Sequence, residues 1–255
     1  MKSPIIIPVD QLIQEPYVLI LCFPNASEAE SQSRLQELRS LGVAALEFSG
    51  TASLFGVGVP VLGKGFVGIV VIAYLKGARV AVKIRRLDAN RADLLHEANM
   101  LSKANSVDVA PKLIAASKNF LLMQLIDGEL LPNWLKTNRD AAAIKKVLRD
   151  VLEQCFRLDQ VGLDHGELSK APKHLLVDKT EKVFIVDFET ASIERKVANV
   201  PAVCQYLFAG NSSASKVLTE IFGEKNRLDL IDILKAYKKN KTRACFERLL
   251  DVCLP

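Results

Sequence analysis

The chain lacks any hydrophobic run long enough to cross a membrane. Its longest apolar region, residues 55–82, is interrupted by Lys64, Lys76 and Arg79, whereas a membrane helix needs about 20 consecutive apolar residues. The first residues, MKSPIIIPVDQLI, contain too short an apolar run for a signal peptide and no small-residue cleavage site. These absences argue against a membrane partner and predict a cytoplasmic protein.

Closely spaced cysteines are missing as well. Five cysteines are scattered over the chain, without a CxxC pair or a spacing typical of metal ligands. We therefore expect buried thiols in a reducing compartment. The cysteines are Cys22, Cys155, Cys204, Cys245 and Cys253.

Extreme composition, internal repeats and low-complexity tracts are also absent. Of the 255 residues, 49% are hydrophobic and 25% are charged, which is typical of a globular protein. A chain of this length can bury one large core or two modest ones, so two lobes are a natural expectation. The net charge of +5 mildly favours anionic partners such as nucleotides or RNA, but it identifies none of them.

Residues 1–54 predict a small α/β extension. Within it, YVLILCF (residues 17–23) is a continuous apolar run of strand length. Asn25 or Ser27 is expected to cap a helix that ends at Gly42, and ALEFSG predicts a second strand. The extension contains no ligand signature.

A glycine-rich stretch follows the extension. LGKGFVGIV fits the pattern GxGxxGxV, with Gly63, Gly65, Gly68 and Val70 at the fixed positions. In a dinucleotide-binding loop such glycines open a helix, but here IVVIAYL continues as a strand rich in β-branched residues. The sequence therefore favours a glycine-rich hairpin that covers the phosphates of a nucleotide. Because glycines have no side chains, backbone N–H groups can approach the anion. Gly77 is expected to form the next hairpin turn.

A lysine and a glutamate are expected to form a buried pair. Lys83 lies in the apolar strand RVAVKI and shares a strand face with Ala81. A lysine in such a strand is costly to bury unless it is paired. Glu97 lies on the apolar face of a helix expected over residues 88–104 with Asp88 as its cap, so it is the natural partner of Lys83.

The second half of the chain is predicted to be mainly helical. Helices are expected from Asn133 or Asn138 to Gly162 and in the tail from Val200, and KVFIVDF (residues 182–188) is expected to be a strand. Between them lies LDHGELSKAPKHLLVD, residues 163–178, which contains acidic and imidazole side chains just before an apolar run.

These features occur in the order found in protein kinases. Residues 63–97 resemble the small lobe of the protein-kinase-like fold, and FLLMQLIDG resembles its last strand and hinge. DHGEL resembles the catalytic loop, and FIVDFE resembles the metal-binding segment. The loop is most similar to the HGDL and HADL forms of small atypical kinases, such as the RIO kinases and the kinase subunit of the KEOPS tRNA-modification complex. The chain also resembles a group of archaeal proteins predicted to be Ser/Thr protein kinases.

The resemblance implies an α+β, bilobal protein-kinase-like fold with a small β-rich N-lobe, a shortened helical C-lobe and the N-terminal α/β extension. The expected domains are residues 1–54 for the extension, 55–126 for the N-lobe with the glycine-rich loop and the Glu97 helix, and 127–255 for the C-lobe. Only 68 residues follow Asp187 and no APE motif occurs among them, which argues against a conventional kinase with a phosphorylated activation loop.

The resemblance also implies a site for ATP with Mg²⁺ or Mn²⁺. Lys83, held by Glu97, is expected to contact the α and β phosphates, while Glu167 positions the attacking hydroxyl or water. Asp187 and His174 are the expected metal ligands. Met123 is the expected gatekeeper, ahead of hinge backbone that meets the adenine edge. The residues expected to contact the nucleotide are Gly63, Gly65, Gly68, Val70, Ala81, Lys83, Glu97, Met123, Gln124 and Ile126.

Three positions depart from the kinase pattern. Glu167 replaces the catalytic aspartate with a side chain one methylene longer, and the nearby Asp164 is expected to be structural. His174 replaces an asparagine, and three roles are open for it: a metal ligand that tolerates Mn²⁺, a phosphate contact, or a structural histidine. Glu189, the last residue of the FIVDFE segment, replaces a glycine, a change that small atypical kinases share.

The first hypothesis is an atypical ATP-dependent Ser/Thr protein kinase or ATPase that acts on a protein substrate, with autophosphorylation on serine expected. The alternative is a pseudokinase-type ATP-binding module that acts on RNA or on a ribosome- or tRNA-related partner. From Lys235 to Arg243 the chain has five basic and no acidic residues, so this stretch is either an RNA contact or a solvated helix end. A small-molecule kinase ranks last, because such enzymes usually keep the aspartate and the asparagine.

Overall fold

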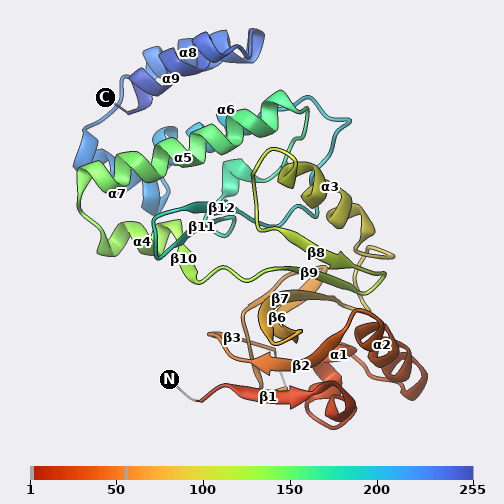
Figure 1. The fold of residues 1–255 in the computed structure, drawn as a ribbon. Helices are drawn as coiled ribbons and strands as arrows, with labels where there is room; N and C mark the ends of the chain where they lie inside the picture. The colour runs from red at the N-terminus through yellow and green to blue at the C-terminus, as the bar shows by residue number, and fades with distance from the viewer. Residues whose placement is uncertain (1–2, 55–56, 255) are drawn as a thin grey trace. The chain divides into compact units, whose positions relative to one another are not determined.

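The computed structural model describes residues 3–54 and 57–254, which form two compact units. Unit 1 comprises Met1–Asn99 and Lys112–Leu125, and unit 2 comprises Met100–Pro111 and Ile126–Pro255. An antiparallel sheet dominates unit 1 and helices dominate unit 2, which confirms the predicted α+β, kinase-like fold class (Figure 1). The predicted domain boundary at residue 55 falls outside the described residues.

Unit 1 is built on a sheet in the order β1-β2-β6-β7-β9-β8, with the short strand β5 paired to β6. Strands β3 and β4 form a separate two-stranded ladder. The first residues of helix α3 belong to this unit and the rest belong to unit 2. The elements are β1 (Ile5–Pro8), the 3₁₀-helix η1 (Val9–Gln11), α1 (Tyr17–Leu21), α2 (Glu28–Ser40), β2 (Val43–Phe48), β3 (Ala52–Ser53), β4 (Pro60–Val61), β5 (Gly63–Lys64), β6 (Gly68–Leu75), β7 (Ala78–Arg85), α3 (Leu95–Asn105), β8 (Leu113–Ala116) and β9 (Phe120–Gln124).

Residues 3–54 share one sheet and one core with the strands that follow. Strand β2 pairs with β6, and helix α2 packs on β2 (Figure 1). Leu35 and Leu38 of α2 belong to the same buried cluster as Ile69 and Val82 of the central strands. The domain boundaries expected after residues 54 and 126 stay predictions.

The expected strand at residues 17–23 is wrong, because this run contains helix α1 (Tyr17–Leu21). Ile20 and Leu21 are buried, and a short apolar run covered on several sides suits a buried helical turn as well as a strand. Helix α2 follows as expected, with Ser27 as its cap: the Glu30 N–H donates to Ser27 Oγ at 3.3 Å.

Both expected hairpins are confirmed. In the glycine-rich hairpin, Gly63 pairs with Val70, and the Gly65 N–H donates to the Gly68 carbonyl at 2.8 Å. Strands β6 and β7 are joined through Lys76 and Gly77, with φ of 50° and 81°. Two consecutive positive φ values are typical of the tight turns that match the twist of paired strands.

The expected start of the Glu97 helix at Asp88 is wrong. Helix α3 begins at Leu95, whose N–H donates to Asp93 Oδ1 at 2.9 Å. Asp88 instead accepts two hydrogen bonds from the Arg86 guanidinium, at 2.8 and 2.7 Å. The expected cap is therefore engaged in an ion pair within the loop, and Asp93 accepts the hydrogen bond at the start of the helix.

Unit 2 combines a three-stranded antiparallel sheet, β10-β11-β12, with six helices of its own among the described residues. The long helix α5 packs against α6, α9 and β12, and α8 and α9 lie side by side (Figure 1). The elements are β10 (Gly128–Leu130), α4 (Leu131–Thr137), α5 (Ala141–Gln160), the 3₁₀-helix η2 (Leu168–Lys170), β11 (Leu175–Asp178), β12 (Val183–Ile185), α6 (Asn199–Cys204), the π-helical turn η3 (Gln205–Ala209), α7 (Ser213–Phe222), α8 (Arg227–Lys239) and α9 (Arg243–Cys253).

The second half follows the prediction with two corrections. The helix expected from Asn133 or Asn138 begins later, at Ala141, because Asp140 caps α5 by accepting from the Ala142 N–H at 2.9 Å; Asn133 lies in a separate helix, α4. The expected strand at 182–188 ends at Ile185, because Asp187 has φ of 71° and leaves the extended conformation. In the described part of the chain, none of the helices is both long and apolar enough to span a bilayer.

Candidate functional site

Lys83 and Glu97 form the expected buried pair in unit 1. The Lys83 ammonium donates to both carboxylate oxygens of Glu97, at 3.0 and 2.8 Å. Their side chains are only 7% and 6% exposed, so each charge depends on the other for its stabilisation. Lys83 comes from β7 and Glu97 from the first turn of α3, where the helix dipole favours a carboxylate.

The register of the sheet places other predicted residues on the same face as Lys83. Val70 lies opposite Lys83 on β6, and Met123 lies opposite Ala81 on β9. Directly opposed residues share a face in an antiparallel sheet, as do residues two apart on one strand. Val70, Ala81, Lys83 and Met123 therefore line one face of the sheet.

The two predicted hinge residues occupy different surroundings. The Gln124 N–H donates to the Lys112 carbonyl at 2.8 Å and is therefore already used within unit 1. Ile126 is half-buried and belongs to unit 2. Their contact with an adenine ring stays a prediction.

The three glycines of the hairpin meet different constraints. A Cβ at Gly68 would lie 2.8 Å from Lys83 Cγ and 3.0 Å from the Ile84 carbonyl oxygen, so this glycine is needed for Lys83 to pack. At Gly63 and Gly65 the nearest atoms would lie at 3.9 and 3.7 Å, which are ordinary contacts. Phe66, at the tip of the hairpin, is 91% exposed. The hairpin is thus packed at one end and open at its tip.

Glu167 and His174 contact each other in unit 2. His174 Nε2 lies 3.1 Å from Glu167 Oε2, and because a carboxylate accepts, the imidazole donates here. His174 is buried and Glu167 is partly exposed. The Nδ1 atom of His174 has no hydrogen-bond partner within the described residues. The sequence did not predict this pair, since two loop residues seven positions apart follow no periodicity; a metal role of His174 stays a prediction.

A second histidine, His165, packs beneath the side chain of His174 in the same loop. His165 is fully buried, and its Nε2 lies 3.1 Å from the Val186 carbonyl oxygen. Its ring packs edge-on against His174 and Phe188, with centroid distances of 5.3 and 4.9 Å. Burial, with a further contribution from His174, lowers the pKa of His165 to about 4. His165 is therefore neutral at physiological pH.

Asp187 lies where strand β12 has ended and the backbone turns. Its φ of 71° is unusual for a residue with a side chain, and such strained conformations concentrate at functional sites. The flanking backbone is fixed, because the Val186 N–H donates to the His174 carbonyl at 2.9 Å and Phe188 is buried. Asp187 and Glu189 both offer carboxylate oxygens, the donors that Mg²⁺ and Mn²⁺ prefer.

Asp164 is part of a brace for the loop, as expected. It accepts from Arg195 Nε at 3.0 Å and from the Ala198 N–H at 3.2 Å, and its backbone pairs with Ser192. Gly166 has φ of 91°, a conformation that residues with a side chain rarely adopt, and a Cβ here would also lie 3.2 Å from the Thr190 carbonyl oxygen.

A buried polar network that sequence reasoning missed holds the same loop. The His165 N–H donates to Asn199 Oδ1 at 2.9 Å. Asp159 accepts from Asn199 Nδ2 and from the Tyr237 hydroxyl, each at 2.9 Å. Burial raises the pKa of the Asp159 carboxyl, although the hydrogen bonds from Asn199 and Tyr237 oppose this. The one sign of this network in the sequence was Asp159 itself, a carboxylate four residues after Cys155 on the buried face of α5.

The basic stretch expected to contact RNA is partly neutralised within unit 2. Arg243 forms hydrogen bonds with both oxygens of Glu153, at 2.6 and 2.8 Å, and an ion pair with Glu247. Lys235 pairs with Asp232 at 3.3 Å. The RNA contact through Lys235–Arg243 stays a prediction.

Comparisons with known proteins identify the family. Residues 72–198, about half of the chain, match the family model of the RIO domain. The uncharacterized protein MJ1211 of Methanocaldococcus jannaschii is 30% identical over 99 residues, which is 38% of this chain and 81% of that protein. Lys83, Glu97, Glu167, His174 and Asp187 all lie within the matched domain, whereas the extension and the glycine-rich hairpin precede it. The chain belongs to the RIO domain family of atypical protein kinases and ATPases.

Proposed function

We propose that this protein is an ATP-dependent phosphotransferase of the atypical Ser/Thr kinase type, which transfers the γ-phosphate to a protein hydroxyl or to water. The observation that carries the proposal is the buried Lys83–Glu97 pair. The pair lies beside a glycine-rich hairpin, and its lysine shares a sheet face with Val70, Ala81 and Met123. A buried ammonium that is held by one carboxylate and flanked by exposed backbone suits a polyphosphate.

In this proposal each half of the site has its own task. In unit 1, Lys83 contacts the α and β phosphates, and the glycine-rich hairpin brings backbone N–H groups to them. In unit 2, Asp187 holds Mg²⁺ or Mn²⁺ and Glu167 accepts the proton of the attacking hydroxyl. A bound metal neutralises part of the phosphate charge. The proposal requires one nucleotide to contact both sets of residues.

The His174–Glu167 contact supports catalysis by the longer carboxylate. A glutamate has one more rotatable bond than an aspartate, so it loses more freedom when its oxygen must sit at one point. The hydrogen bond from His174, at 3.1 Å, restricts that freedom before substrate arrives. We therefore assign His174 to the orientation of Glu167 and Asp187 to the metal.

The test is transfer of radiolabel from γ-labelled ATP, with Mg²⁺ and separately with Mn²⁺. The double variant Lys83→Met/Glu97→Gln removes both charges of the buried pair together, so that neither is left buried without the other. Lys76→Ala, in the exposed turn between β6 and β7, is the matched control. We expect label on the wild type and on the control, on serine by phosphopeptide mass spectrometry, and none on the double variant. Absence of label and of ADP release in both metals would contradict phosphoryl transfer, and ATP binding without turnover would favour the pseudokinase alternative.

A further inference from the structure

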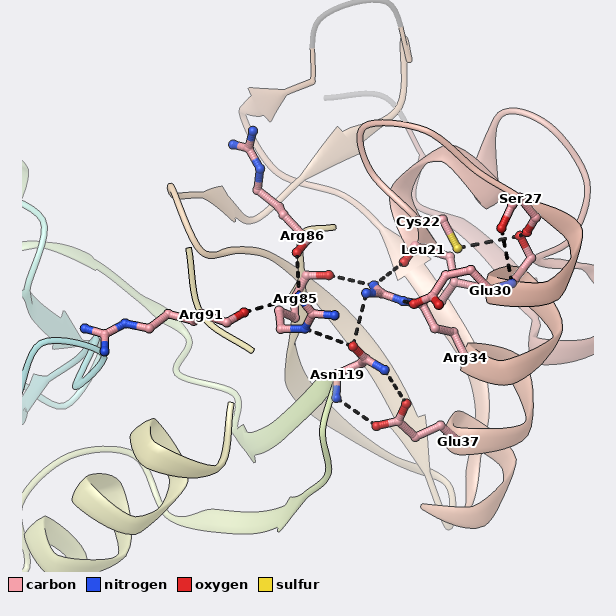
Figure 2. A network of polar contacts seen from close by, with 11 residues as sticks. Leu21, Cys22, Ser27, Glu30, Arg34, Glu37, Arg85, Arg86, Arg91 and Asn119 are labelled. Atoms are coloured by element: carbon pink, nitrogen blue, oxygen red, sulfur yellow. Dashed lines mark hydrogen bonds and ion pairs between the residues drawn. The ribbon is translucent and has the colours of Figure 1, made fainter. Parts of the chain in front are cut away.

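The extension contacts three consecutive residues, Arg85, Arg86 and Leu87, which follow Lys83 at the end of β7. Arg34 of α2, which is fully buried, reaches this segment: its Nη1 donates to the Arg85 carbonyl at 2.6 Å and to the Leu21 carbonyl at 2.7 Å (Figure 2). One guanidinium thus joins helix α1, helix α2 and the end of the strand that carries Lys83.

The same guanidinium contacts Asn119, the residue before β9. Arg34 Nη2 donates to Asn119 Oδ1 at 3.1 Å, and Arg85 Nε donates to the same oxygen at 2.9 Å (Figure 2). Glu37 of α2 accepts from the Asn119 N–H and Nδ2 at 2.8 and 2.7 Å. Two buried arginines are therefore held together by a shared amide oxygen, with Glu37 on the far side of that amide and Glu30 paired to Arg34 at 2.7 Å.

Arg85 also forms hydrogen bonds with the segment that leads into α3. Its Nη1 donates to the carbonyl of Arg86 at 3.2 Å and to that of Arg91 at 3.3 Å (Figure 2). Helix α3 begins four residues after Arg91 and carries Glu97 in its first turn. Glu97 thus follows a segment that Arg85 holds in place, and Arg85 in turn shares the Asn119 oxygen with Arg34 of the extension.

Arg86 makes the corresponding connection to the glycine-rich hairpin. Its N–H donates to the Val67 carbonyl at 2.8 Å, and its Nη1 donates to the Gly65 carbonyl at 3.0 Å. The same guanidinium lies over the ring of Phe23, 4.8 Å from the centroid, and the Leu87 N–H donates to the Phe23 carbonyl at 2.8 Å. The hairpin is therefore held by an arginine that rests on a residue of the extension.

We propose that Phe23 and Arg34 of the extension, acting through Arg85 and Arg86, are positioning residues of the nucleotide site. They hold the glycine-rich hairpin and the segment before α3 in place before ATP binds. The inference rests on the proposed function. A hairpin with glycines at its open end loses much backbone freedom on closing over phosphates, so an arrangement that restricts it in advance lowers the cost of binding. The extension lies outside the residues that match the RIO domain model.

Three variants separate the connections. Arg34→Lys keeps the charge but cannot make the forked contacts to two carbonyls and an amide. Arg86→Gln removes the cation from Phe23 and from the Gly65 carbonyl, and Phe23→Leu keeps an apolar side chain without the ring. Arg39→Gln is the matched control, because Arg39 lies on the same helix but pairs with Asp10 on the surface, at 2.6 Å.

Two measurements test the proposal on the full chain. Hydrogen exchange of the nucleotide-free proteins should be faster over residues 63–68 and 86–94 in the three variants and unchanged in Arg39→Gln. Calorimetric titration with ATP and Mg²⁺ should show a Kd raised about 10-fold in Arg86→Gln, as expected for the loss of a charged hydrogen bond that pre-orders the hairpin. Phe23→Leu, the mildest change, keeps the test valid if Arg34→Lys does not fold. No ATP binding by the wild type would overturn both proposals; normal binding by the wild type, with exchange and Kd unchanged in the variants, would overturn this one alone.

Discussion

Gly68 is the hairpin glycine at which an added methyl group has a predictable consequence. It would lie 2.8 Å from Lys83 Cγ and 3.0 Å from the Ile84 carbonyl oxygen, so either the lysine or the β7 backbone must move. At Gly63 the same methyl group meets only Val70 Cβ, at 3.9 Å. Gly68→Ala and Gly63→Ala are therefore a matched pair on one hairpin.

We expect Gly68→Ala to lower the free energy of unfolding by about 1–3 kcal/mol, the usual cost of adding a methyl group to a packed site. Gly63→Ala should change it by less than about 1 kcal/mol and in the stabilising direction, because alanine has less backbone freedom to lose than glycine. Urea denaturation of the nucleotide-free proteins measures both values. A displacement of Lys83 by about 1 Å should also lower kcat/KM for ATP by up to about 100-fold.

The comparison between the two variants is what tests the reasoning. Equal destabilisation by both, or a Gly68→Ala variant as stable as the wild type, would show that the Lys83 side chain does not pack against the hairpin. In that case the placement of Lys83 beside the phosphates would lose its structural basis.

Three further predictions concern unit 2. The pKa of His165 is about 4 in the folded protein and near 6.5 in the unfolded chain, so the unfolded state takes up the proton first as the pH falls. The free energy of unfolding of the metal-free protein should therefore drop by about 2 kcal/mol between pH 7 and pH 5. Denaturation curves of His165→Gln should lack this part of the drop. Tyr237→Phe removes a donor from buried Asp159 and should cost about 1–3 kcal/mol in urea denaturation, whereas an unchanged midpoint would contradict the role of that network. His174→Ala should lower kcat by about 10–100-fold, through loss of the orienting bond to Glu167, with the Kd for ATP unchanged by calorimetry; a changed Kd with normal kcat would argue for a phosphate contact instead.

The parts of the site that the sequence predicted correctly depend on short-range periodicity. Alternation along β7 places Ala81 and Lys83 on one face, and the helical spacing of Glu97 places it among apolar residues. A buried lysine and a buried glutamate on neighbouring elements then need each other, which is why their pairing follows from the sequence. Gly77 was equally predictable, because tight turns need residues that accept positive φ.

The parts that the sequence did not predict depend on contacts between distant residues. Arg34, Arg85 and Asn119 are far apart in the chain, and only the folded unit brings them together. The pairing of Glu167 with His174 depends on the path of a loop, which has no repeating pattern.

Secondary structure failed where two local signals were equally good. Residues 17–23 have the length of a buried strand, yet Tyr17–Leu21 form a short helix whose apolar residues fill the same core. Asp88, the expected cap, pairs with Arg86 instead, and Asp93 accepts the hydrogen bond from the first residue of α3. In both cases tertiary contacts decided between alternatives that local propensity left equal.

The most direct test of the central claim is a calorimetric titration of the wild-type protein with ATP and Mg²⁺, alongside the double variant Lys83→Met/Glu97→Gln. The account predicts saturable binding to the wild type with a 1:1 ratio, and binding at least about 10-fold weaker in a double variant that remains folded by circular dichroism, since it has lost a buried charged contact to phosphate. A flat titration of the wild type with Mg²⁺ and with Mn²⁺, or equal affinity in the double variant, would contradict it.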